Sequence, residues 1–141
     1  MKHSISIDVA TPPERVWQVL TTVDEWPRWT ASVDQVEWLD AGGPLALGSR
    51  VRISQPRLPA TDYTITAIVP GRSFTWTATA PGVRMSADHV LEPLAAGGTC
   101  VQLSVTQTGW LGAILGRLYG SLTARYLALE ANGLKAASEQ A

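Results

Sequence analysis

The side chains that could do chemistry in this 141-residue chain are few and scattered. Its two histidines, His3 and His89, and its one cysteine, Cys100, lie far apart and lack the spacing of a zinc site. The sequence has no P-loop and no dinucleotide-binding glycine motif. Nothing marks a Ser-His-Asp triad or the paired carboxylates of a glycosidase. We therefore predict no metal and no cofactor.

His89 is the leading candidate for chemistry because it lies in a segment that alternates apolar and polar residues. Successive side chains of a strand point to opposite faces, and His89 shares the parity of Met85 and Ala87. An inward imidazole can act as a general acid/base or orient a ligand, since it titrates near neutral pH. The alternative is a core histidine satisfied by a backbone carbonyl or by water. Asp88 and Glu92 fall on the outward parity.

Three other polar side chains, Tyr63, Gln55 and Gln107, fall on inward strand positions. Each either offers a hydrogen bond to a ligand or ends the core at the rim of the sheet, and Tyr63 is the second candidate for moving protons. Phe74 and Trp76 share one inward face as well. They either form an aromatic wall for a flat apolar ligand or pack an ordinary core.

Strands are the elements that must position these side chains. Two-residue periodicity bounded by Gly, Pro and Asp turns predicts seven of them. Short turns make neighbouring strands antiparallel. The alternation of apolar and polar residues indicates that one face of the sheet is buried and the other is exposed to solvent. The expected strands cover residues 4–9, 33–39, 49–55, 63–69, 72–80, 83–92 and 99–107.

Two short helices are expected between the first two strands. The sequence TPPE predicts a helix start with Thr11 as N-cap and Glu14 closing a capping box. Asp24 is the expected cap of a second short turn that contains Pro27. The tryptophans of this turn are expected to pack it against the rest of the domain.

The segment 110–138 predicts a helix about 43 Å long at about 1.5 Å per residue, with Thr108 as its cap. One stripe of the helix carries Leu111, Leu115, Leu118, Leu122, Tyr126, Leu129 and Gly133. Gly112, Gly116 and Gly120 recur beside this stripe, although each costs about 1 kcal/mol in a helix. Either another backbone approaches closely, or empty volume lies beneath the helix. A membrane-dimer motif is disfavoured because Arg117 interrupts the apolar run.

Composition indicates a single folded domain over residues 1–141. Hydrophobic residues make up 45%, charged residues 16%, and the net charge is −1, which argues against disorder and against nucleic-acid or anionic-membrane partners. A lone cysteine excludes an internal disulfide and fits a reducing compartment. No signal peptide and no membrane span are visible, so a cytoplasmic location is expected.

Several phrases keep their order along almost the whole chain: VATPPERVWQVLTTVDEWPRW, PGRSFTWTA, ADHVLEPLAAGGT and ALEANGLKAASE. They resemble the START-like (SRPBCC, helix-grip) superfamily and are similar to its polyketide cyclase/dehydrase and lipid-transport branch. The resemblance implies an α+β fold in which a seven-stranded, strongly curved antiparallel sheet wraps around a long C-terminal helix. It also implies a deep cavity between sheet and helix, with Trp26 and Trp29 near its mouth.

Three functions follow from this resemblance. The first is binding or transport of a small hydrophobic ligand such as a lipid, polyketide or aromatic compound, by a monomer or homodimer. The alternatives are a polyketide cyclase, aromatase or dehydratase that uses His89 or Tyr63, and a protein-interaction module with a collapsed cavity. The expected cavity residues are Trp29, Gln55, Tyr63, Phe74, Trp76, Met85, Ala87, His89, Gln107, Leu115, Tyr119 and Leu122.

Overall fold

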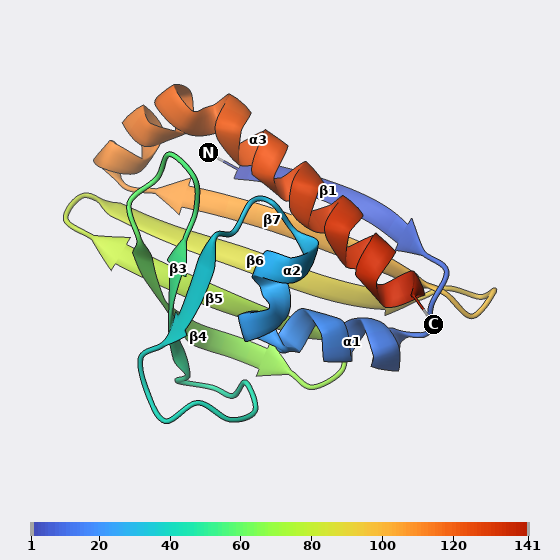
Figure 1. Cartoon of the computed structure of the whole chain (residues 1–141). Coiled ribbons are helices and arrows are strands. Elements are labelled where there is room, and N and C mark those ends of the chain that lie inside the picture. Colours follow the sequence, from blue (N-terminus) through green and yellow to red (C-terminus); the bar gives the residue numbers. More distant parts are fainter. Residues whose placement is uncertain (1, 141) are drawn as a thin grey trace.

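A seven-stranded antiparallel sheet and a long C-terminal helix dominate the computed structural model, which describes residues 2–140 (Figure 1). The strands lie in the order β1-β7-β6-β5-β4-β3-β2, so only the β1–β7 pair joins strands distant in sequence. This α+β helix-grip architecture confirms the expected fold. The strands are β1 (Lys2–Val9), β2 (Gln35–Trp38), β3 (Arg50–Ser54), β4 (Thr61–Val69), β5 (Ser73–Ala80), β6 (Val83–Pro93) and β7 (Thr99–Thr108).

All the helices lie on one face of the sheet. Between β1 and β2 the chain forms α1 (Pro13–Thr21), the 3-10 turn η1 (Val23–Glu25) and α2 (Trp26–Trp29). The last helix, α3 (Trp110–Glu139), ends within one residue of its expected bound. It packs along β1 and β7, while α1 and α2 lie beside its C-terminal half (Figure 1). No helix among residues 2–140 is long and apolar enough to cross a membrane.

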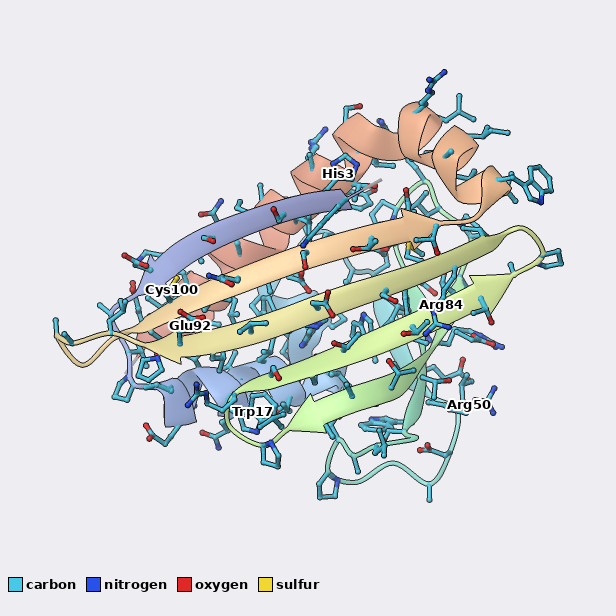
Figure 2. The ribbon with its side chains drawn as sticks, turned by 180° about the vertical axis from the view of Figure 1, so that it is seen from behind. His3, Trp17, Arg50, Arg84, Glu92 and Cys100 are labelled. Atoms are coloured by element: carbon cyan, nitrogen blue, oxygen red, sulfur yellow. The ribbon has the colours of Figure 1, made fainter. Side chains whose placement is uncertain are left out.

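The parity of the strand side chains follows the sequence prediction. On β5 the inward residues Phe74 and Trp76 are buried. Figure 2 shows the opposite face of the sheet, where Arg84, Glu92 and Cys100 project away from α3. One irregularity was not predicted: the β4–β5 register shifts between Ile65 and Ala67, which indicates a bulge in β4.

The predicted capping box of α1 is wrong. The N-cap is Pro12, and no side chain caps the helix. Thr11 is buried, and its hydroxyl instead donates to the Ser138 carbonyl at 3.1 Å. Its own carbonyl accepts a hydrogen bond from Thr99 Oγ1 at 2.7 Å. These tertiary partners link both chain ends to β7 and outcompete the local capping bond.

The other two predicted caps are wrong as well. The η1 turn and α2 begin without a side-chain cap, so Asp24 does not perform that role. The N-cap of α3 is Gly109, whose φ of 90° is left-handed. A Cβ at that position would lie 2.4 Å from the Gly82 carbonyl oxygen, so only glycine fits between the two segments. The Thr108 hydroxyl lies 3.5 Å from the Arg84 carbonyl instead.

The most buried residues of α3 lie to one side of the leucine stripe. Leu118 is 69% exposed, whereas Gly112 and Gly116 are buried. At Gly112 an added Cβ would lie 3.2 Å from a backbone carbon of Gln107, so the start of the helix packs closely on β7. The buried positions along α3 are Gly112, Gly116, Leu127, Glu130, Ala131, Leu134 and Ser138.

Candidate ligand cavity

A cavity of about 790 Å³ lies between the inner face of the sheet, α3 and the β3–β4 loop. Its inner end is formed by Trp26 and Trp76, which are 2% and 4% exposed. Its outer end includes Pro59, Ala80 and Tyr119, which are exposed and therefore form the mouth. The interior is open rather than collapsed, and its wall is mostly apolar.

Most of the expected cavity residues meet in this wall. They are Gln55, Tyr63, Trp76, Met85, Ala87, His89, Gln107, Leu115 and Tyr119. Phe74, Trp29 and Leu122 do not belong to it. Phe74 is buried behind His89 and meets Trp17 edge-on, while the backbone of Trp29 abuts Gly133. Leu122 is half-buried on α3 outside this wall, although Leu115 and Tyr126 of the same stripe line it. Trp26, expected at the mouth, instead lines the inner end.

His89 is held rigidly at the inner end of the cavity. The side chain is 2% exposed, and its Nδ1 lies 3.2 Å from the Phe74 carbonyl oxygen. Because a carbonyl only accepts, Nδ1 carries the proton and donates it there. The ring stacks on Phe74 with centroids 4.1 Å apart, and meets Trp76 and Trp26 edge-on. The backbone carbonyl thus satisfies one nitrogen and leaves Nε2 free to face other groups.

Glu130 on α3 faces His89 Nε2, and the sequence prediction missed it. Its Oε1 lies 3.8 Å from Nε2, which is longer than a hydrogen bond. The residue is 9% exposed, unusual for a carboxyl group. A signal was present, since Glu130 lies three residues after Leu127 and four before Leu134, on the face that is buried. Glu130 is thus a buried carboxyl group on a mostly apolar face of α3.

Tyr63 is buried in the cavity wall. It is 7% exposed and stacks on Trp76 with ring centroids 5.3 Å apart. Its hydroxyl lies 3.9 Å from Met85 Sδ. Burial, followed by the nearby Glu130 carboxyl, raises the pKa of Tyr63 above its usual value of 10.0. The phenol therefore stays protonated and serves as a hydrogen-bond donor.

The rim of the cavity is tied to α3. The Tyr126 hydroxyl on α3 donates to the Pro56 carbonyl in the β3–β4 loop. Arg57, next in that loop, has a φ of 66°, the one positive φ outside glycine among the described residues. Figure 1 shows the loop rising beside the first half of α3. Deeper inside, Gln107 Nε2 lies 3.8 Å from Met85 Sδ.

The cavity therefore offers an apolar aromatic wall, one buried phenol donor and one buried His–Glu pair. Among residues 2–140, no three His, Cys, Asp or Glu side chains converge as a metal ion requires. Such a wall with a few convergent polar groups is typical of a site for a small organic molecule.

Solved structures of similar fold include three at high structural similarity. ZhuI aromatase/cyclase from Streptomyces sp. R1128 has a TM-score of 0.78 and 20% identity, over 99% of this chain and 93% of that one. Hypothetical protein jhp0584 from Helicobacter pylori has a TM-score of 0.81 and 12% identity, over 98% and 86%. A START superfamily protein from Mycobacterium smegmatis has a TM-score of 0.74 and 16% identity, over 99% and 97%. At these identities the likeness shows the fold alone.

No functionally curated protein matches the sequence. One family model does, and it spans residues 2–139, nearly the whole chain. The resemblance seen in the sequence phrases and the helix-grip architecture agree with this match. The chain belongs to the polyketide cyclase / dehydrase and lipid transport family.

Proposed function

We propose that this protein binds a small hydrophobic ligand in the cavity between the sheet and α3. The observation that carries the proposal is the cavity itself, about 790 Å³ in volume with a mostly apolar wall. Ligand sites commonly measure about 300–1,000 Å³ and have this character. The ligand enters past Pro59 and Tyr119 and reaches the rings of Trp26 and Trp76. Its apolar body contacts the strand side chains in between.

Filling the cavity is expected to abolish binding. Ala87 lies on the cavity wall, so Ala87→Phe places a benzyl group where the ligand would lie. Titration with the neutral dye Nile red, followed by fluorescence, is expected to show binding to the natural protein and at least about tenfold weaker binding to this variant, about 1.4 kcal/mol. Ala67→Phe is the matched control, because Ala67 is an exposed residue of β4 outside the cavity wall. This variant is expected to retain binding.

Overpacking costs about 1–3 kcal/mol, so thermal unfolding of both variants must show that they are folded at the assay temperature. Failure of the natural protein to bind the dye or any apolar compound extracted with it would contradict the proposal. Equal weakening by the two phenylalanines would also do so.

A second candidate function is catalysis of the polyketide cyclase or dehydratase kind, and the buried His89–Glu130 pair favours it. In an aldol ring closure, His89 Nε2 would take a proton from a carbon between two carbonyls. The resulting carbanion would attack another carbonyl carbon of the same chain, and the protonated imidazole would return the proton to the new alkoxide oxygen. Confinement in the cavity would lower the entropic barrier. The family description and the fold likeness to an aromatase/cyclase support this candidate.

Removing the base is expected to separate catalysis from binding. With a linear poly-β-ketone thioester as substrate, His89→Asn is expected to lower kcat by about 10²–10⁴-fold while Nile red affinity changes little. Product formation is followed by chromatography against a buffer blank. A natural protein that cyclises or dehydrates the substrate no faster than buffer would leave ligand binding as the function.

A further inference from the structure

We propose that the cavity selects apolar ligands whose polar end donates a hydrogen bond, such as a hydroxyl or ammonium group, over ligands that end in a carboxylate. This inference rests on the proposed ligand binding and specifies the chemical class of the ligand. The structure carries it in three ways: the acceptor atoms at the inner end, the distribution of cationic side chains, and the aromatic rings around the His–Glu pair.

At the inner end of the cavity, His89 Nε2 and Glu130 Oε1 face each other. Nδ1 of His89 donates to the Phe74 carbonyl, so in the neutral form of the ring Nε2 carries a lone pair. It faces Oε1 of Glu130 across 3.8 Å, beyond the 2.7–3.2 Å of a direct N–H···O bond. A ligand oxygen or nitrogen placed beside this gap can lie at hydrogen-bond distance from both atoms. An ammonium group donates to both, and a hydroxyl donates to one of them.

Cationic side chains that would bind a carboxylate are missing from the inner end. Within the described wall, the one Lys or Arg is Arg52, which lies at the rim with its side chain 45% exposed. Its guanidinium is already engaged by Asp62, with N···O distances of 2.7 and 3.1 Å, and lies 3.8 Å from Glu37. A ligand carboxylate at the inner end would be buried beside the Glu130 carboxyl, with no Lys or Arg side chain there to pair with it. Burying an unpaired charge is costly.

The rings around the pair favour the same class of ligand. Trp76 and Trp26 line the inner end, and their ring centroids lie 5.2 and 5.8 Å from that of His89. The face of an aromatic ring has a negative electrostatic potential, so it attracts an ammonium group and repels an anion. The walls leading to the pair are apolar and accommodate the hydrocarbon part of such a ligand.

Three compounds that share one twelve-carbon chain test this selectivity: dodecan-1-ol, dodecylamine and dodecanoate. Each is used below its micelle concentration to displace Nile red from the full-length protein. The alcohol and the amine are expected to displace the dye at concentrations at least about tenfold lower than dodecanoate, equivalent to about 1.4 kcal/mol.

The same titrations are made with Glu130→Gln, which keeps the shape of the side chain and removes the carboxylate. Its amine-over-carboxylate preference is expected to fall by about tenfold, again about 1.4 kcal/mol. Glu139→Gln is the matched control, since Glu139 lies on the same helix but at the surface, where Lys135 pairs with it. This variant is expected to keep the preference of the natural protein.

The outcomes separate this inference from the binding proposal. Displacement by dodecanoate at equal or lower concentration overturns the selectivity and leaves ligand binding intact. A preference that survives unchanged in Glu130→Gln overturns the assignment to the His–Glu pair. If neither Nile red nor any of the three compounds binds the natural protein, the proposed function fails and the selectivity fails with it.

Discussion

Replacing Trp26 by alanine is expected to lower the free energy of unfolding by about 3–5 kcal/mol, the usual cost of deleting a buried tryptophan. Trp26 is 2% exposed and joins the short helices to the sheet. Its ring lies 5.2 Å from those of both Trp29 and Trp76. Its Nε1 donates to the Leu20 carbonyl at 2.8 Å. The substitution therefore enlarges the cavity and leaves a buried carbonyl without its donor, which adds to the loss.

Urea unfolding followed by circular dichroism measures this loss through the shift in midpoint at constant slope. Trp110→Ala is the matched control, because Trp110 is 72% exposed at the start of α3. We expect it to change the free energy of unfolding by less than about 1 kcal/mol, as surface substitutions do. If both variants lose the same stability, Trp26 does not join the short helices to the sheet as its contacts indicate.

Two glycine-to-alanine substitutions in α3 are expected to change stability in opposite directions. A Cβ at Gly133 would lie 2.0 Å from the Trp29 carbonyl oxygen, a backbone atom that cannot rotate away. Overpacking of this kind costs about 1–3 kcal/mol or more, and the gain in helix propensity of about 1 kcal/mol does not offset a contact this short. Gly133→Ala is therefore expected to destabilise the protein by about 2 kcal/mol, as α2 is forced away from α3.

Gly120 provides the comparison within the same helix. A Cβ there would meet only the His3 ring, 3.4 Å from its Cε1, which is an ordinary contact. Gly120→Ala is expected to raise the free energy of unfolding by up to about 1 kcal/mol through helix propensity. Both values come from urea titrations of the two variants beside the natural protein. A neutral or stabilising Gly133→Ala would show that α2 does not pack against α3 as closely as the structure describes.

The strand predictions succeeded because they depend on a short-range rule. Alternation with a period of two residues assigns every strand side chain to a face, whichever strand lies next to it. His89 and Trp76 are inward for that reason, and Arg84 and Glu92 are outward (Figure 2). The long helix was bounded within one residue for a similar reason, since its period continues from Trp110 to the end.

The helix caps and the cavity face of α3 were predicted less well because they depend on distant partners. Thr11 has capping chemistry, but a buried bond to the Ser138 carbonyl replaces it. The most buried positions of α3 lie beside the leucine stripe, and glycine and alanine occupy several of them because β7 approaches the start of the helix closely. Leu122, which is expected in the cavity, lies outside its wall.

By itself, the sequence determined the order of elements, the parity of the strands apart from the bulge in β4, and the choice of His89 as a candidate, since all of these depend on neighbours along the chain. Only the tertiary structure decided which side of α3 faces the sheet, and with it the pairing of Glu130 with His89 across the cavity. The physical reason is that a helix with apolar residues on several sides can rotate about its axis at little cost in propensity. Its final rotation is selected by backbone contacts from remote segments, such as Trp29 against Gly133.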